Sequence, residues 1–141
     1  MRAYALAMAE SRKYKFTSGE WRYLARGARL LAQKDGENYE RRKSSSLAEW
    51  SLEFQRLHEE MAELCDYWGG RADGAPKGKD TCRKFGGTEL RDLARGCRLM
   101  LDNEVERASE RVELTELAKL CERYADDVDH ANWVSSRELS S

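Results

Sequence analysis

Apolar residues recur along this chain in steps of three and four, the spacing that places side chains on one face of an α-helix. The longest such series lies between residues 47 and 68. Its members are Leu47, Trp50, Phe54, Leu57, Met61, Leu64 and Trp68. A seam of this kind is typical of a helix that packs against neighbouring helices. We therefore predict a helix over this segment, with the seam buried.

The segment before this seam carries a helix start signal and an apolar stripe of its own. Thr17 stands three residues ahead of Glu20, which is the pattern of a capping box. The stripe that follows comprises Trp21, Leu24, Ala28 and Leu31. Ser46 and Glu49 repeat the capping pattern directly before the seam. The sequence thus predicts two consecutive helices, each beginning at a capping box.

The second half of the chain repeats this organisation. Residues 24–31 read Leu-Ala-Arg-Gly-Ala-Arg-Leu-Leu, and residues 93–100 read Leu-Ala-Arg-Gly-Cys-Arg-Leu-Met. Gly27 and Gly96 occupy equivalent places in the middle of the repeated helix, where glycine costs about 1 kcal/mol relative to alanine. The pair indicates either a close approach of two helices or a feature inherited through duplication.

We predict an all-α fold in a single domain that spans residues 1–141. An internally duplicated helical hairpin forms a four-helix bundle, because neither hairpin can bury its apolar stripes alone. The pseudo-repeats are residues 18–68 and 87–133. The linker between them, residues 69–87, contains six of the ten glycines and the only proline.

The two ends of the chain lie outside this duplicated unit. Residues 1–16 are predicted to contain a short N-terminal helix that carries Tyr4 and Met8 at helical spacing. Val134 to Ser141 is expected to be a frayed tail, as chain termini often are.

Composition supports helices and limits the partners. Charged residues make up 36% of the chain and hydrophobic residues 40%, with one proline, which favours long, charge-decorated helices over a sheet. The 25 basic and 26 acidic residues give a net charge of −1, so the chain as a whole lacks the positive field that attracts nucleic acid. Basic patches at residues 12–16, at residues 41–43 and in the linker leave only weak nucleic-acid contact open.

Six arginines form two rows on the repeated helix. They are Arg22, Arg26, Arg29, Arg91, Arg95 and Arg98. Each trio follows i, i+4, i+7 spacing and falls on the face opposite the apolar stripe. We predict that both rows are exposed and bind the phosphates or the acidic surface of a partner. The alternative is that they pair with nearby acids, which are concentrated in residues 47–68 and 112–133.

One set of carboxylates points to an enzyme instead. Glu60-x-x-Glu63 is followed by Glu89-x-x-Asp92, and carboxylates one turn apart on two helices can hold Mg²⁺. The pattern resembles the E-x-x-E…E-x-x-D motif of the all-α nucleoside triphosphate pyrophosphatases, the MazG-like family. The resemblance covers these four residues and their spacing, and it implies a Mg²⁺-dependent nucleotide hydrolase. It requires the four carboxylates to converge in one cleft.

The cysteines and histidines show no metal-binding spacing. Cys97 and Cys121 lie on apolar stripes, and we expect them in the core. Cys65, Cys82 and His130 would be the ligands of a zinc site, but no short ligand pair anchors such a site. We therefore predict free thiols, no metal, no cofactor and no catalytic residue.

These observations favour a non-enzymatic interaction module, a small adaptor or inhibitor that binds a protein or nucleoprotein partner. Inhibitors made by phages and mobile elements against host defence, anti-CRISPR proteins among them, often look like this. The alternatives are the Mg²⁺-dependent pyrophosphatase and a small nucleic-acid-binding helical protein. The apolar seams also leave a homodimer open. The apolar run Ala3 to Ala9 is too short to cross a membrane and lacks a secretory cleavage pattern, so we expect a cytoplasmic protein without a membrane partner.

Overall fold

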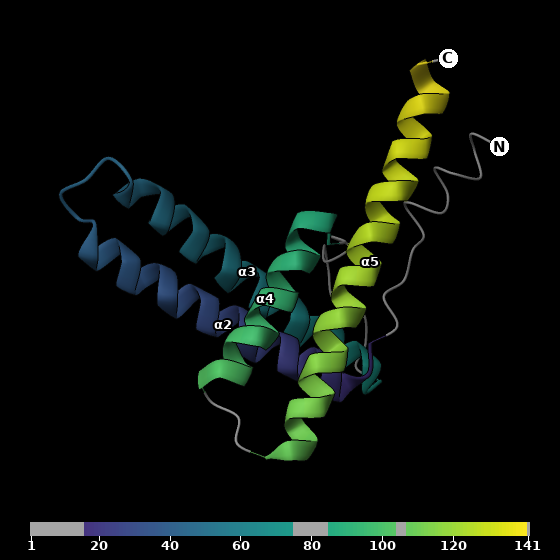
Figure 1. The fold of residues 1–141 in the computed structure, drawn as a ribbon, viewed down its shortest axis with the longest axis horizontal. Coiled ribbons are helices and arrows are strands. Elements are labelled where there is room, and N and C mark those ends of the chain that lie inside the picture. Colours follow the sequence, from purple (N-terminus) through teal and green to yellow (C-terminus); the bar gives the residue numbers. More distant parts are fainter. Residues whose placement is uncertain (1–15, 75–84, 104–106, 141) are drawn as a thin grey trace.

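The computed structural model describes residues 16–74, 85–103 and 107–140, and every regular element in these ranges is a helix (Figure 1). The helices are α2 (Ser18–Arg41), α3 (Ala48–Ala72), α4 (Gly87–Asn103) and α5 (Ala108–Ser140). The all-α prediction is confirmed for these residues. The predicted N-terminal helix with Tyr4 and Met8 lies outside them, as does most of the predicted linker.

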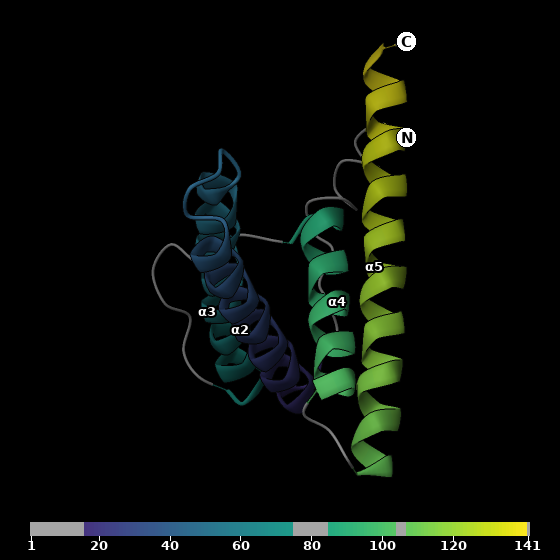
Figure 2. The same cartoon turned by 60° about the vertical axis from the view of Figure 1, so that its left-hand side comes forward.

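The helices form two hairpins that cross. Helix α2 packs along α3, α4 packs along α5, and the two pairs meet through α2 and α4. Figures 1 and 2 show the outer end of the α2–α3 pair and the C-terminal half of α5 leaving the crossing in different directions. The predicted four-helix bundle is therefore not confirmed, because the helices of a bundle lie within about 20° of one another.

Two glycines allow α2 and α4 to touch at the crossing. A Cβ atom added to Gly27 would lie 2.9 Å from the carbonyl carbon of Gly96, and one added to Gly96 would lie 2.8 Å from that of Gly27. Real Cβ atoms essentially never make contacts this short, so the two backbones meet with no side chain between them. Of the two interpretations of the glycine pair, the close approach of two helices is the one that the structure supports.

The core lies where the hairpins cross. Both cysteines expected there, Cys97 and Cys121, are fully buried. Other fully buried side chains of this core are Phe85, Leu24, Met61, Leu90, Leu93, Met100, Leu114 and Cys65. Phe16, just before α2, packs edge-on against Trp21 and Tyr124, with ring centroids 4.7 Å and 5.3 Å apart. Burial of one large apolar side chain contributes about 1.5–3 kcal/mol, so this shared core holds the two hairpins together.

The start of α2 follows the prediction, whereas the start of α3 does not. The hydroxyl of Thr17 accepts a hydrogen bond from the backbone N–H of Glu20 at 3.1 Å, and the Glu20 carboxylate accepts one from the N–H of Thr17 at 2.9 Å. At α3, Leu47 occupies the N-cap position without a side-chain cap, and its N–H donates to the Ser45 hydroxyl. The capping box predicted at Ser46 is wrong, because the neighbouring serine and the backbone close this turn.

Helix α3 buries a different face from the one that its seam predicts. Its buried residues are Ala48, Ser51, His58, Met61, Ala62, Cys65 and Gly69. Of the seam, Met61 is fully buried, and Leu57, Leu64 and Trp68 pack partly against the core. Trp50 and Phe54 are exposed, so their predicted burial is wrong. The buried face of α3 therefore includes Met61 from the seam, whereas the first part of the seam, from Leu47 to Phe54, is exposed.

Helices α3 and α5 both extend beyond their predicted ends. Helix α3 continues to Ala72, so the connection to α4 begins later than the predicted linker. Helix α5 continues through most of the predicted tail to Ser140. The Arg137 guanidinium lies 5.0 Å from the centre of the Trp133 ring, a contact one turn apart that supports the added helix. The frayed tail predicted from Val134 is therefore wrong.

Candidate interaction surfaces

The arginines predicted to bind a partner lie on the surface of the two crossing helices. Arg22, Arg26 and Arg29 are exposed on α2, and Arg91, Arg95 and Arg98 are exposed on α4. Their expected exposure is confirmed. Whether they bind a partner stays a prediction. Their availability to a partner depends on the acidic side chains that pair with them.

On the first hairpin, arginines of α2 pair with acids near the C-terminal end of α3. Arg22 lies 2.6 Å from Asp73, which follows the last turn of α3, and Arg29 pairs with Asp66. The hydrogen bond with Asp66 raises the pKa of Arg29. These side chains are about half exposed, so water and salt screen the pair, and it contributes about 0–1 kcal/mol.

The second hairpin repeats this arrangement between α4 and α5. Arg91 reaches Asp129 at 2.8 Å and Asp126 at 2.9 Å, and Arg98 pairs with Glu122. Hydrogen bonds with Asp129 and then Asp126 raise the pKa of Arg91. The arginine rows are thus matched by acids of their own hairpins, and the positive field that they offer a partner is smaller than the sequence suggests.

The carboxylates of the pyrophosphatase-like pattern do not form a metal site. Glu60 and Glu63 are exposed on α3, and Glu89 accepts a hydrogen bond from the backbone at the start of α4. Asp92 lies 3.3 Å from the Nε2 atom of His58. Among the described residues, no group of three or more His, Cys, Asp or Glu could hold a metal ion. The geometry that the MazG-like resemblance requires is not formed by these four residues.

The ligands of the zinc alternative also lie in unlike environments. Cys65 is fully buried on α3, His130 is exposed on α5, and Cys82 lies outside the described residues. Burial raises the pKa of the Cys65 and Cys121 thiols, and it raises that of Cys97 to about 12. Since the thiolate is the form that binds metals and attacks electrophiles, these three thiols are inert in the folded chain.

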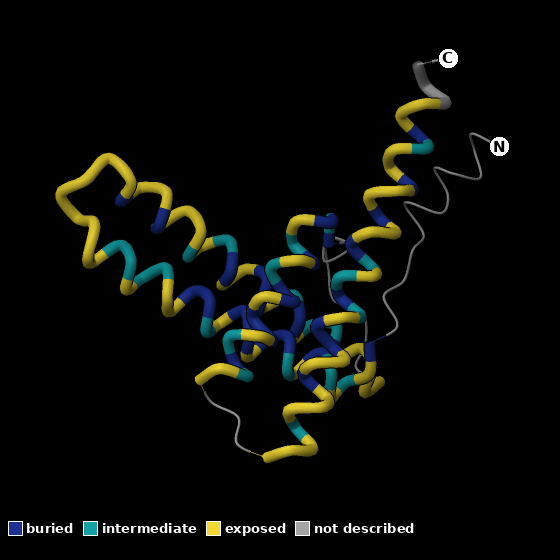
Figure 3. The backbone as a smooth tube through the Cα atoms, viewed as in Figure 1, coloured by how far each residue is buried: buried dark blue, intermediate teal, exposed yellow. Residues whose placement is uncertain are grey.

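Three apolar side chains that the sequence assigns to the core are instead gathered on the surface of α3. Leu47 is 52% exposed, Trp50 61% and Phe54 47%. Their i, i+3, i+7 spacing places them on one side of the helix, and we call them the outer α3 patch. Figure 3 shows that the outer part of the α2–α3 hairpin is largely exposed. Because single exposed apolar residues are common but clusters are not, this patch is the strongest candidate for an interaction site.

The outer α3 patch continues a buried stripe past the point where the second hairpin crosses. Further along the same side, Leu57 is partly buried against the core and Met61 is fully buried. The periodic spacing does not change at the crossing, only the presence of covering helices does. No sequence signal could therefore have separated the exposed half of the stripe from the buried half.

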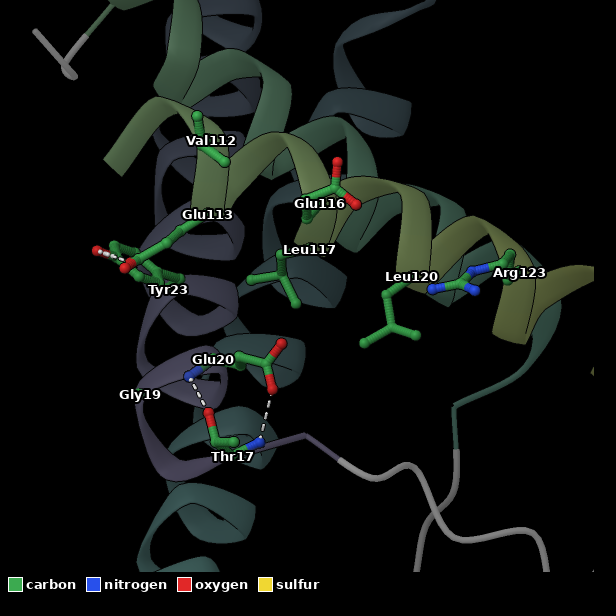
Figure 4. Close-up of a pocket in the computed structure, with 10 residues that line it drawn as sticks. All are labelled: Thr17, Gly19, Glu20, Tyr23, Val112, Glu113, Glu116, Leu117, Leu120 and Arg123. Atoms are coloured by element: carbon green, nitrogen blue, oxygen red, sulfur yellow. Dashed lines mark hydrogen bonds between the residues drawn. The ribbon is translucent and has the colours of Figure 1, made fainter. Parts of the chain in front are cut away.

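A shallow hollow of about 510 Å³ lies between the start of α2 and the first half of α5 (Figure 4). The hydroxyl of Tyr23 donates a hydrogen bond to Glu113 across it, at 3.2 Å. The lining residues are Thr17, Gly19, Glu20, Tyr23, Val112, Glu113, Glu116, Leu117, Leu120 and Arg123. Ligand sites combine an enclosed apolar pocket with a few convergent polar groups. This hollow is open to solvent and its carboxylates are spread along its rim, so we assign it no ligand.

Comparisons with protein-family models, with curated proteins and with solved structures found no match to this chain. Within the described ranges, none of the helices combines the length and the apolar content needed to cross a bilayer. The function must therefore be inferred from the surfaces described above.

Proposed function

We propose that this protein is a non-enzymatic interaction module, an adaptor or an inhibitor, that binds a protein partner through the outer α3 patch. The observation that carries the proposal is the exposure of Leu47, Trp50 and Phe54 on one side of a single helix. Four of the six large apolar side chains that are exposed in the described residues fall between positions 47 and 54. Tryptophan is enriched among the residues that contribute most to binding energy, which favours Trp50 as the anchor.

The charges beside the patch indicate what kind of partner fits it. Residues 48–60 contain four glutamates and one arginine, and Glu49 and Glu53 are both exposed. Helical geometry puts these two carboxylates together along one border of the patch. A complementary surface is an apolar helix face bordered by Lys or Arg, since charges of opposite sign steer and orient a docking helix. The partner that we propose therefore presents a basic amphipathic helix.

The arginine rows are a second proposed contact. Their ion pairs are exposed, so a carboxylate or phosphate of a partner can replace the hairpin acids with little loss of stability. An inhibitor of a nucleoprotein defence complex, of the anti-CRISPR type, would use both surfaces. The outer α3 patch would bind the protein, and the arginine rows would bind acidic groups of the complex. The unpaired buried cysteines suit the reducing cytoplasm, where we place this activity.

A pair of defined peptides tests the patch. Both are amphipathic helices with the same leucine stripe, flanked by lysines in one and by glutamates in the other. We expect the lysine peptide to bind at least about tenfold more tightly, because the border of the patch is acidic. The double variant Trp50→Ser/Phe54→Ser should weaken this binding by at least about tenfold in isothermal titration calorimetry, because both aromatic anchors are lost.

Trp133→Ser is the matched control, since Trp133 is a similarly exposed tryptophan on another helix, at 57%. It should bind the lysine peptide as the wild type does. Equal binding by the double variant would contradict the proposal. If the wild type forms a dimer and the double variant does not, the patch serves self-association instead.

The arginine rows are tested separately, by reversing Arg22 and Arg95 to Glu and capturing partners with each protein. An unchanged set of captured partners would show that the rows are not a contact.

A further inference from the structure

A buried histidine joins three helices near the crossing. His58 of α3 has no exposed side-chain surface, and Asp35 of α2 and Asp92 of α4 are only 15% and 16% exposed. Nδ1 of His58 lies 2.5 Å from Oδ2 of Asp35, and Nε2 lies 3.3 Å from Oδ2 of Asp92. Since α3 and α4 belong to different hairpins, the imidazole bridges the two halves of the molecule.

Arg95 and Phe54 also contact this cluster. The second carboxylate oxygen of Asp92 lies 3.6 Å from Nη2 of Arg95, at the surface of α4. The Phe54 ring stacks on the imidazole, with centroids 6.3 Å apart. Within the described part of the chain, Asp35 from α2 and Asp92 from α4 are the charged groups that hydrogen-bond the imidazole. The protonation state of His58 therefore decides whether the imidazole donates hydrogen bonds to both carboxylates.

Both contacts are hydrogen bonds only when the imidazole carries two protons. An ionised carboxylate can only accept, and a neutral imidazole has one N–H donor and one lone pair. Loss of a proton to solvent therefore leaves one ring nitrogen directing its lone pair at a carboxylate oxygen. We assign the remaining proton to Nδ1, because its contact with Asp35 is the shorter of the two. Nε2 is then left facing Asp92 without a proton.

We propose that the Asp35–His58–Asp92 cluster is a pH-responsive link between the two hairpins, closed while His58 is doubly protonated and open on its α4 side when one proton leaves. Deprotonation preserves the bond within the first hairpin and removes the one that spans the hairpins. The glycine contact between α2 and α4 remains. The link therefore modulates how firmly the hairpins are held together, and it does not decide whether each hairpin forms.

The direction of the pH dependence follows from the balance of forces on the imidazole. Burial acts to lower the pKa of His58, the hydrogen bonds with Asp92 and Asp35 act to raise it, and the net result is a pKa above the ordinary 6.5. A group whose pKa is raised on folding contributes stability that is fully present below its unfolded pKa and is lost as pH rises through its folded pKa. The link is therefore closed at mildly acidic pH and opens toward alkaline pH.

Urea unfolding across a pH series tests the link. For the wild type, the equilibrium constant of unfolding should rise with pH between the unfolded and folded pKa values of His58, by up to about tenfold per pH unit. His58→Gln should lack this rise. His130→Gln is the matched control, because His130 is the other histidine of the chain and is exposed on α5. It should keep the wild-type dependence.

Asp92→Asn tests the same link from its other side without removing the imidazole. The asparagine amide can donate to the unprotonated Nε2, so this variant suits the neutral form of His58. The midpoint of the His58 titration, followed by the NMR resonances of the imidazole, should fall relative to the wild type. Even if His58→Gln does not fold, this variant and the wild-type titration still decide the matter.

A double-mutant cycle reports on the link between the hairpins specifically. The coupling between His58→Gln and Asp92→Asn should favour the wild-type pair at acidic pH. It should be lost or reversed in sign at alkaline pH, where the neutral imidazole faces Asp92 without a proton and accepts from the asparagine amide instead. Parallel pH curves for the wild type and His58→Gln would overturn the proposal, and so would a His58 midpoint below 6.5 or one unchanged by Asp92→Asn. None of these measurements involves a partner, so their outcome is independent of the binding proposed for the outer α3 patch.

Discussion

At Gly27 and Gly96 the absence of a side chain decides how closely two helices approach. Glycine in the middle of a helix destabilises it by about 1 kcal/mol relative to alanine. The contact between the two backbones offsets this loss, since it brings the core residues on either side of the crossing within reach of one another. The glycines are therefore required by packing, and substitution should show a sign opposite to that expected from helix propensity.

Gly27→Ala should lower the free energy of unfolding by about 1–3 kcal/mol, because the new methyl group would press against the Gly96 backbone and force the helices apart. Urea denaturation followed by circular dichroism measures this change. Gly19→Ala is the matched control. Its added Cβ would meet no atom closer than Thr17 Oγ1 at 3.9 Å, so it should be at least as stable as the wild type. A Gly27→Ala protein of unchanged stability would show that the helices do not touch.

At the scale of the helix, the same short pattern has two different outcomes. Thr17 with Glu20 makes a reciprocal capping box at the start of α2. Ser46, which also stands three residues before a glutamate, caps nothing, and α3 begins at an N-cap leucine. A capping pattern describes what a side chain is able to do, whereas the path of the incoming turn decides whether its hydroxyl points at the free N–H groups.

Thr17→Ala should destabilise the protein by about 1 kcal/mol, because one N–H group of the first turn of α2 loses its partner. Ser46→Ala should change stability by less than about 0.5 kcal/mol, because the exposed hydroxyl makes no capping bond. Thermal and urea unfolding of the two variants, measured side by side, check both values. A loss at Ser46 as large as that at Thr17 would mean that α3 begins earlier than it does here.

At the scale of the molecule, the two hairpins share one core. Cys65, Cys97 and Cys121 come from three different helices, and all three are fully buried. Each hairpin exposes part of this core if the other leaves, so the thiols report on the integrity of the crossing. Their raised pKa values add a second protection, since a protonated thiol reacts slowly.

In a Cys82→Ser variant, these three thiols should react with a disulfide reagent only as fast as the protein opens, and all three should react at once in denaturant. The release of the reagent's chromophore, followed over time, measures the rate. Combining Cys82→Ser with Gly27→Ala should speed the reaction, because a weaker crossing opens more often. Rapid modification of any of the three thiols in native buffer would contradict a shared core.

The chain's local patterns predict its helices well. Periodic apolar spacing and one capping box predict the helices of the described residues, the start of α2 and the exposure of the arginines. The glycine pair leaves two interpretations open, and only the structure selects the close approach of two helices. The helices, the capping box and the exposed arginines depend on residues within a few turns of one another. Such local features form in the same way whichever other helices pack nearby.

The features that bear on function arise instead from how the helices are placed. Trp50 and Phe54 carry the same spacing as Met61, yet the crossing covers Met61 and leaves the other two bare. Asp35 and Asp92 meet His58 from 23 and 34 residues away along the chain. A periodic pattern specifies which side of a helix is apolar, but it holds no information on where a neighbouring helix ends or which distant carboxylate arrives. Only the packing of the hairpins sets those contacts.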